Sequence, residues 1–409
     1  MLTSTLSLYK NAFSGLSKST WLLSLVILIN RSGTMVIPFM TIYLTQPAMG
    51  YSIGQAGFVM GLFGLGAVCG GLMGGRLTDK FGFYYVQLIT LTGGGIMFMI
   101  LGQMTSYTFI CIFTFLLSLV NEAFRPANST AVAHFSKEEN RTRSFSLNRM
   151  AINLGWAFGG ALGGLLASID YHLLFWVDGC TNIIAAVLLR YFLSPEKNTA
   201  THQPKKATSA PLQSAYKDKG YLAFLICTIL FGICFFQLFT TMPVYFKNEL
   251  RLPEYGIGLL MTMSGVLIAT VEMILVFSLE GKRSGLHYVS RGVFVVGISF
   301  LLLNLLPGAG LIAVLCMLVA TFGEISSMPF MNSFWVGRTS ANNRGQYAGL
   351  YTMAWSSAQV LGPSLGAQVA GHYSFRALWW VTGCTCFVAA LGFKWLLGKT
   401  PQDFTSINK

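Results

Sequence analysis

The chain has 409 residues, of which 54% are hydrophobic and only 10% are charged, and its mean hydropathy is +0.60. Because a soluble protein carries about 25% charged residues, this composition excludes an ordinary soluble fold. The formal net charge of +13 could indicate a nucleic-acid partner. The positions of the basic residues therefore decide what the charge means.

Twelve apolar segments are long enough to cross a hydrocarbon core of about 30 Å, which takes about 20 helical residues. We expect these segments at 21–44, 55–75, 85–103, 108–133, 145–167, 172–193, 222–246, 255–278, 288–306, 311–336, 347–369 and 375–397. Barrel strands would be about ten residues long and would alternate apolar with polar residues, and these segments show no such alternation. The sequence therefore predicts an all-α membrane protein with twelve transmembrane helices.

Basic residues gather in every second connection between these helices. If both ends of the chain are cytoplasmic, the cytoplasmic segments and their flanking helix ends hold 21 of the 27 Lys and Arg residues. This positive-inside pattern explains the net charge through topology and attraction to lipid head groups. We therefore expect cytoplasmic N- and C-termini and no nucleic-acid partner.

The second half of the chain repeats the first half at a nearly constant offset. A shift of 203 residues aligns Gly82, Tyr85, Val86 and Pro126 with Gly285, Tyr288, Val289 and Pro329. After a one-residue insertion the shift becomes 204, and Trp176 meets Trp380. Two six-helix bundles in the same orientation form a parallel repeat, with the substrate site at their interface. We place the N-terminal bundle at 1–194, a cytoplasmic linker at 195–220 and the C-terminal bundle at 221–409.

The connection between the second and third predicted helices carries a motif. Residues 75–82 read GRLTDKFG, which resembles the loop signature of the major facilitator superfamily. Glycine permits a tight turn, and an aspartate there can bind the positive N-terminus of a helix in the other half and help to latch one conformational state. We predict Gly75, Asp79, Lys80 and Gly82 as conformational-switch residues.

The fifth predicted helix carries closely spaced glycines. They are Gly155, Gly159, Gly160, Gly163 and Gly164. Their spacing resembles the motif of the superfamily's drug:proton antiporters, although Gly160 stands where that motif has proline. Small residues at this spacing let helices approach closely and slide, and they also serve ordinary membrane-helix packing. We add Gly159 and Gly163 to the predicted conformational-switch residues.

Seven charged residues fall inside the apolar segments, where each costs about 2.5 to 3.5 kcal/mol at a helix centre and therefore tends to face a cavity or a partner. They are Arg31, Glu122, Arg125, Arg149, Asp178, Glu272 and Glu324. Glu122 and Arg125 are three residues apart, so they share one helical face and can form a local pair. For Arg149 and Asp178 we expect structural pairing.

Helices 1, 4, 7 and 10 line the central cavity in the superfamily, and the resemblance therefore places Arg31, Glu122, Arg125 and Glu324 around the substrate. A buried carboxylate can carry protons, because desolvation favours its neutral form and a nearby Arg favours its charged form. We expect Glu324 to couple transport to protons, followed by Glu122 and Glu272.

Three short segments also resemble proton-coupled oligopeptide transporters. They are residues 124–129, 151–155 and 323–329. This resemblance implies that Arg125 and Glu324 engage peptide or couple to protons, with Arg31 as a carboxylate partner, although the acid-rich signature of that family's first helix is absent. Gln237 and Tyr245 in the seventh helix are candidates for the opposite wall of the substrate site.

The chain shows no signature of a P-loop, a metal-ligand cluster or a catalytic triad. We therefore expect no enzyme, no metal and no cofactor, with a proton gradient as the energy source. One hypothesis is a proton antiporter that exports small amphipathic organic molecules. A second is a proton symporter for peptide-like, zwitterionic or anionic solutes, and a third is a receptor without transport. We expect a monomer in a bacterial inner membrane, in contact with lipids, protons and a small-molecule substrate.

Overall fold

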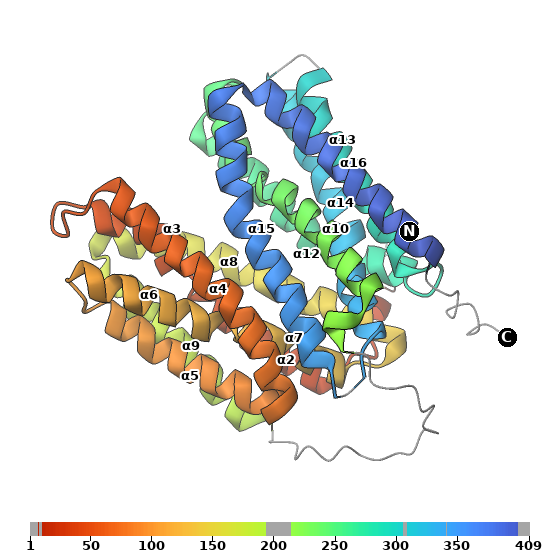
Figure 1. Cartoon of the computed structure of the whole chain (residues 1–409), viewed down its shortest axis with the longest axis horizontal. Coiled ribbons are helices and arrows are strands. Elements are labelled where there is room, and N and C mark those ends of the chain that lie inside the picture. The colour runs from red at the N-terminus through yellow and green to blue at the C-terminus, as the bar shows by residue number, and fades with distance from the viewer. Residues whose placement is uncertain (1–6, 8–9, 194–213, 306–308, 341, 400–409) are drawn as a thin grey trace.

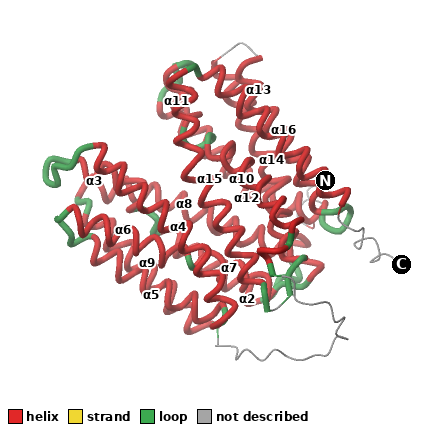
Figure 2. Tube along the Cα trace, viewed as in Figure 1, coloured by secondary structure: helices red, strands yellow, loops and turns green. Residues whose placement is uncertain are grey.

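The computed structural model describes residues 7, 10–193, 214–305, 309–340 and 342–399. These residues form helices and loops, and no strand occurs among them (Figure 2). Ten helical stretches of the described residues, two of them made of two consecutive α-helices, are long and apolar enough to cross a membrane. The other two predicted spans are present as one helix split into two short pieces and one long helix of lower hydropathy. The predicted all-α membrane fold is confirmed.

The N-terminal bundle contains the first six spans. Its elements are α2 (Lys18–Ser32) and α3 (Val36–Thr45), α4 (Ile53–Phe81), α5 (Phe83–Leu101), α6 (Tyr107–Glu122) and α7 (Phe124–Phe135), η1 (Glu138–Asn140), α8 (Arg141–Ile169) and α9 (His172–Phe192). Between α4 and α5 the chain turns at Gly82 alone, with φ at +84°. Glycine adopts this conformation without strain, which explains its place in the loop signature.

The C-terminal bundle contains the remaining six spans. Its elements are η2 (Ala215–Lys217), α10 (Lys219–Phe236) and α11 (Thr241–Asn248), α12 (Glu254–Leu279), α13 (Gly285–Leu305), α14 (Ala309–Gly337), α15 (Arg344–His372) and α16 (Phe375–Lys399). Most of the linker predicted at 195–220 lies outside the described residues. We call the end of the molecule where α9 ends and α10 begins the linker side, and the opposite end the far side.

Span 1 is not the single helix that its apolar run predicts. It breaks between α2 and α3, and Asp178 of α9 binds the start of α3. The carboxylate accepts hydrogen bonds from the backbone N–H of Met35 at 3.0 Å and of Val36 at 2.8 Å. A helix start has unsatisfied N–H groups and a positive dipole end, so a buried carboxylate stabilises it. Asp178 therefore has the structural pairing that we expected, with a backbone partner.

Spans 4 and 7 are interrupted as well. The helix of span 4 changes at Ala123 from α6 to α7, and that of span 7 stops at Phe236 and resumes at Thr241. At the second interruption the buried amide of Gln237 donates to the carbonyl of Gly362 at 2.6 Å. Such side chains satisfy backbone groups that a broken membrane helix would leave without partners.

The two bundles meet along α4 and α15, which lie side by side in the middle of Figure 1. The contact is formed by backbone, because both helices present glycines. A Cβ atom on Gly75 would lie 2.8 Å from the Cα of Gly349, and one on Gly349 would lie 2.9 Å from the carbonyl oxygen of Gly71. Small residues of this kind permit close helix approach in membranes.

Toward the far side the bundles diverge, as Figure 1 shows at upper left. A Cβ on Gly64 would still be close to the side chain of Val360, at 2.5 Å. Closer to the far side, toward the start of α4, a Cβ on Gly61 or on Gly57 would have no neighbour within 4 Å. The glycine contacts are thus confined to the part of α4 nearer the linker side, and the structure is closed on that side.

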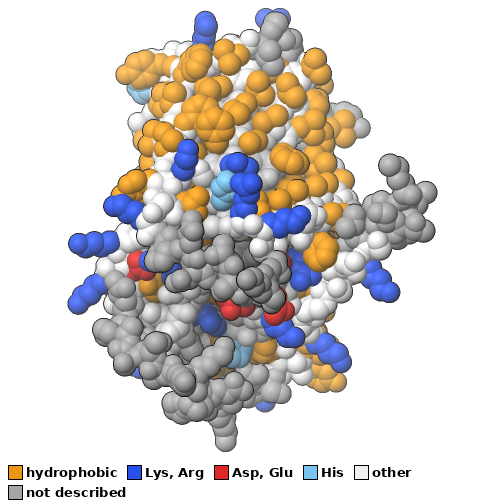
Figure 3. Space-filling view, turned by 90° about the vertical axis from the view of Figure 1, so that its right-hand side faces the viewer, with side chains coloured by type: hydrophobic (Ala, Val, Ile, Leu, Met, Phe, Trp, Pro, Cys, Tyr) orange, Lys and Arg blue, Asp and Glu red, His pale blue; other side chains and the backbone are white. Residues whose placement is uncertain are grey.

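The outer surface is largely apolar, as a lipid-facing surface requires. Large side chains such as Ile89 and Leu391 are 66% and 64% exposed on the outside of the bundles. Seen from the right-hand side of Figure 1, Lys and Arg side chains gather below a broad apolar area (Figure 3). This separation of apolar and basic surface is typical of a protein that spans a bilayer.

Candidate functional site

A polar pocket lies inside the N-terminal bundle, at the break in span 1. Its charged residues are Arg31 of α2, Glu122 at the end of α6 and Arg125 of α7. Asn30, Asn121, Asn182 and Thr34 add polar groups, and Ile37, Phe63, Phe98 and Trp156 add apolar walls. Gln359 of α15 is the one residue that the C-terminal bundle contributes among those lining this pocket. The pocket therefore borders the space between the bundles.

Glu122 and Arg125 form the local ion pair that their spacing predicts. The Nε atom of Arg125 lies 2.8 Å from a carboxylate oxygen of Glu122. The break between α6 and α7 leaves both residues on the pocket wall, with Glu122 buried and Arg125 partly exposed. The charges of this pair cancel within the pocket.

Arg31 differs from Arg125 because its guanidinium has no acceptor among the described residues. The residue is 6% exposed, and no described residue accepts a hydrogen bond from its side chain or forms an ion pair with it. The polar neighbours Asn30 and Asn182 bond to each other instead, at 2.8 Å. Gly155 allows this packing, because a Cβ there would lie 2.6 Å from the Cβ of Arg31.

A second charged cluster joins the two bundles. Arg149 of α8 lies 2.6 Å from a carboxylate oxygen of Glu272 in α12 and 3.2 Å from one of Glu324 in α14. All three side chains are largely buried. Two acids and one base leave one negative charge in a low-dielectric setting, where such interactions are strong.

The structure thus divides the predicted cavity charges into two sites. Arg31, Glu122 and Arg125 lie together in the pocket, as we expected. Glu324 lies apart from them and pairs with Arg149, which we expected to pair structurally and did not assign to the site. Of the three carboxylates predicted to couple to protons, Glu122 therefore lies in the pocket, and Glu272 and Glu324 lie in the second cluster.

The linker side is closed by the contact that the loop signature led us to expect. The carboxylate of Asp79 accepts hydrogen bonds from the backbone N–H groups of Gly345 and Gln346, at 2.6 and 2.7 Å. These residues begin α15, so the negative charge sits at the positive end of a helix in the other bundle. Lys80 is exposed and lies over the ring of Phe81.

A second bridge on the linker side involves Glu280, which follows α12. It accepts a hydrogen bond from the backbone N–H of Thr142 at 2.9 Å and forms an ion pair with Arg143 at 3.0 Å. Burial raises the pKa of Glu280 above its ordinary value, against the opposing effect of Thr142 and Arg143. The hydroxyls of Thr142 and Ser333 add an interbundle contact of 2.6 Å.

Within the C-terminal bundle, Asp218 fixes the start of α10. Burial alone would raise the pKa of Asp218, but hydrogen bonds from Arg338, the backbone of Tyr221 and the hydroxyl of Tyr347 hold it below its ordinary value. The guanidinium of Arg338 makes two of these bonds, at 2.9 and 2.8 Å. Bidentate pairs of this kind are strong and directional.

The N-terminal segment at residues 10–16 crosses the seam between the bundles. Arg143 donates to the carbonyls of Asn11 and Ser14, both at 3.2 Å. Ala12 is fully buried in a small cluster with Leu147 of the N-terminal bundle and Met273 of the C-terminal bundle. The segment therefore contacts both bundles while the linker side is closed.

The other predicted site residues serve packing. In span 7, Tyr245 packs edge-on against Trp379, and Gln237 bonds to Gly362 and Thr241. Neither residue lines the pocket, so neither is placed on a substrate wall in this state. Gly159 and Gly163 of α8 face the break in span 1, where Cβ atoms would meet Ser32 and Met35 at 3.1 and 3.2 Å.

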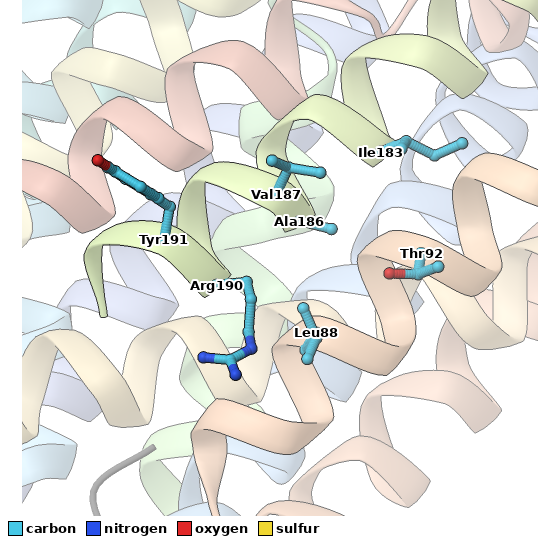
Figure 4. Close-up of a pocket in the computed structure, with 7 residues that line it drawn as sticks. All are labelled: Leu88, Thr92, Ile183, Ala186, Val187, Arg190 and Tyr191. Carbon is cyan, nitrogen blue, oxygen red and sulfur yellow. The ribbon is translucent and has the colours of Figure 1, made fainter. Parts of the chain in front are cut away.

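A shallow groove runs between α5 and α9 on the outside of the N-terminal bundle (Figure 4). It is lined by Leu88 and Thr92 of α5 and by Ile183, Ala186, Val187, Arg190 and Tyr191 of α9. Arg190 extends toward α5, and Tyr191 points away from it (Figure 4). The groove is mostly apolar, and none of the charged residues of the two clusters lines it, so we do not place the transport site there.

Residues 20–363 match the family model for the Major Facilitator Superfamily. The chain belongs to the major facilitator superfamily. It is therefore a multi-pass integral membrane protein of a transporter family, and the resemblance read from the loop signature is confirmed.

Relatives within the superfamily match the chain over most of its length. "Uncharacterized MFS-type transporter YqjV" of Bacillus subtilis (strain 168) is 24% identical, with 85% of each chain covered. "Multidrug resistance protein MdtH" of Salmonella arizonae is 21% identical and covers 91% of this chain and 93% of its own. The crystal structure of a bacterial homologue of the iron transporter ferroportin in an outward-facing state has a TM-score of 0.73, with 17% identity over 93% of this chain and 100% of that one.

In this superfamily member, sequence reasoning missed the partner of Glu272 and Glu324. Arg149 is separated from them by 123 and 175 positions, so no local spacing shows the contact. One signal was available, because three bases and four acids inside apolar segments can nearly neutralise one another. That balance indicates pairing across helices, and it does not say which residues pair.

Proposed function

We propose that this protein is a proton-coupled secondary active transporter that exports small amphipathic organic molecules by alternating access. In this proposal the linker side faces the cytoplasm of a bacterial inner membrane, as the basic residues suggest. The observation that carries the proposal is the bridge from Arg149 to Glu272 and Glu324. This bridge places two buried carboxylates and one base where their charges hold the two bundles together.

Protonation of the bridge would loosen the closed side. A first proton cancels the excess negative charge of the cluster and leaves Arg149 paired with the other carboxylate, whereas a second proton leaves the buried charge of Arg149 uncompensated, which costs about 3 to 5 kcal/mol. Protonation of both Glu272 and Glu324 from the far side therefore favours opening on the linker side. Deprotonation on the linker side restores the bridge and favours closure. This cycle moves protons inward while the pocket faces each side in turn.

The pocket supplies the features that a small amphipathic substrate needs. Phe63, Phe98 and Trp156 offer apolar contact, and Arg31 with several side-chain amides offers polar contact. The pocket has a volume of only about 30 Å³ in this state, so a substrate would also occupy the space between the bundles that the pocket borders. The similarity to the multidrug resistance protein supports export.

The alternative is proton symport of a zwitterionic or anionic solute, and the unpaired Arg31 favours it. Antiport and symport would both use the bridge from Arg149 to Glu272 and Glu324. Only the direction of substrate flux relative to proton flux distinguishes the two hypotheses. We would load inverted vesicles with an acid-inside gradient and add 2-naphthoate, neutral 2-naphthamide or 2-naphthylmethylammonium. Collapse of the gradient on addition of a probe supports antiport, and uptake into right-side-out vesicles driven by outside acid supports symport.

The coupling role is tested by single carboxylate variants in proteoliposomes. Glu324→Gln and Glu272→Gln should lower proton-driven flux at least tenfold, and Glu249→Gln, at an exposed carboxylate, should leave it unchanged. Full proton-driven transport by Glu324→Gln would remove Glu324 from the coupling role. Absence of flux for every probe would favour a receptor without transport.

A further inference from the structure

We propose that the groove between α5 and α9 binds one anionic phospholipid, with the phosphate at the guanidinium of Arg190 and an acyl chain along the apolar wall. The groove has a volume of about 650 Å³ and lies on the outer surface of the N-terminal bundle, which faces the bilayer. Arg190 marks its linker-side end, in the last turn of α9. The site is separate from both charged clusters, so the inference does not rest on the proposed function.

The groove begins where two glycines hold α5 and α9 together. A Cβ atom on Gly179 would lie 2.9 Å from the carbonyl oxygen of Gly95, so the two backbones touch at this point. About one turn nearer the linker side, Thr92 and Ile183 line the groove. The groove thus runs along the helices from the interior of the span to Arg190, which is the direction that an acyl chain takes in a bilayer.

The matching seam of the C-terminal bundle shows that the fold does not require this groove. There α13 and α16 repeat α5 and α9, and a Cβ on Gly383 would lie 3.2 Å from the carbonyl oxygen of Gly297. About one turn nearer the linker side, the rings of Phe294 and Phe387 stack with their centroids 4.7 Å apart. The offset of 204 residues places Ile183 opposite Phe387. The groove is therefore a property of the side chains of the first half.

The charge at the end of the groove lacks a partner within the described part of the protein. Arg190 is exposed, and no described residue accepts a hydrogen bond from its guanidinium or forms an ion pair with it. No charged residue occurs in α5, and the other charge of α9, on Asp178, is bound by Met35 and Val36. The guanidinium extends toward α5 (Figure 4). A phosphate diester would supply both the acceptors and the opposite charge.

The surroundings of Arg190 favour a lipid over a soluble anion. Tyr191 is 81% exposed and points away from the groove, as aromatic residues at a membrane interface do (Figure 4). A free phosphate would bind the charge and leave the apolar wall of Leu88 and Val187 uncovered. A zwitterionic lipid would bring an ammonium group close to the guanidinium. An anionic lipid matches both the charge and the wall.

The test is a titration of the full chain in detergent, freed of lipid, with phosphatidylglycerol or with phosphatidylcholine of the same acyl chains. Native mass spectrometry gives the affinity for the first bound lipid. A hydrogen-bonded charge pair should make phosphatidylglycerol bind at least about tenfold tighter than phosphatidylcholine. Glycerol 3-phosphate, which has the charge without the chains, should not displace phosphatidylglycerol. Equal affinity for the two lipids, or displacement by glycerol 3-phosphate, would overturn the proposal.

Arg190→Gln should weaken phosphatidylglycerol binding at least about tenfold and leave phosphatidylcholine binding unchanged. Lys394→Gln is the matched control, because it removes the exposed base at the corresponding position beside the filled seam. Diffuse attraction to one basic residue is worth about fivefold, so this control should lower the affinity by no more than that. Equal losses in the two variants would mean that Arg190 acts only through diffuse charge, and the proposal would fail.

The position of the acyl chain is tested by filling the groove. Ile183→Phe places there the residue that the second half has at Phe387. Phosphatidylglycerol with a diazirine in its acyl chain, irradiated in nanodiscs, should label peptides of α5 and α9 in wild type, and Ile183→Phe should remove that label. Labelling only of other helices, or full labelling of the filled groove, would refute the site. Neither readout needs transport, so loss of proton coupling would leave this inference standing.

Discussion

Adding one methyl group at the seam between α4 and α15 should shift the protein toward the state that is open on the linker side. In the structure a Cβ on Gly75 would lie 2.8 Å from the Cα of Gly349 and closer still to the carbonyl oxygen of Gly345. Both neighbours are backbone atoms, so no side-chain rotation can relieve the clash. Gly75→Ala therefore forces the two helices apart wherever they pack as they do here.

The size of the effect follows from the geometry. Ordinary contact begins at 3.4 Å, so the helices must separate by at least about 0.6 Å in a close-packed interface. Overpacking of this kind costs about 1 to 3 kcal/mol. The cost applies only while the linker side is closed, because the helices part when it opens. The equilibrium should shift about 5-fold to 150-fold toward the open state.

Double electron–electron resonance measures this shift as a change in the distance between two spin labels. The labels are attached at Ala48→Cys and Asn248→Cys in a background without other cysteines. These positions lie at the far-side ends of the two bundles, so their distance should shorten in Gly75→Ala as the far side closes. Gly61→Ala is the matched control on the same helix, because a Cβ there meets nothing within 4 Å. An unchanged distance in Gly75→Ala, or an equal change in Gly61→Ala, would refute the reasoning.

Three further predictions concern carboxylates. Asp79→Asn removes the charge from the start of α15, so the same spin-label distance should shorten, and an unaltered distribution would show that the contact does not favour closure. Asp178→Asn places amide hydrogens near the N–H groups of α3 and should lower the free energy of unfolding by about 1 to 3 kcal/mol. The midpoint of thermal unfolding should therefore be lower than in wild type, and an equal midpoint would contradict this. The lowered pKa of Asp218 means that its stabilising effect is present above its ordinary value of 3.8 and is lost as pH falls further. The difference in midpoint between wild type and Asp218→Asn should therefore shrink below that pH, and a difference independent of pH would count against the role of the charge.

Most of the fold could be predicted because the bilayer imposes strong local constraints. The length of each apolar run and the distribution of Lys and Arg depend only on nearby residues, so the twelve spans could be recognised. The breaks could not. Hydropathy records apolar content alone, and the break at Met35 depends on Asp178, which lies 143 positions away.

The candidate site was predicted in part for a related reason. Arg31, Glu122 and Arg125 could be grouped, because helices 1 and 4 line the cavity in the resembled superfamily. Glu324 was assigned to the same cavity by the same rule. Its pairing depends on how α8 packs against α12 and α14, which periodicity does not reveal. That Arg31 forms no ion pair with a described residue could not be predicted from the sequence, because it depends on the partners of the other buried charges.

The segment at residues 10–16 has a consequence for how fast the protein can change state. Ala12 is buried between Leu147 and Met273, which belong to bundles that must separate on this side. Each opening must strip the segment from one bundle or carry it along with the other, and either route adds to the activation barrier. Substitutions in this short stretch should thus alter turnover without touching the pocket or the carboxylates.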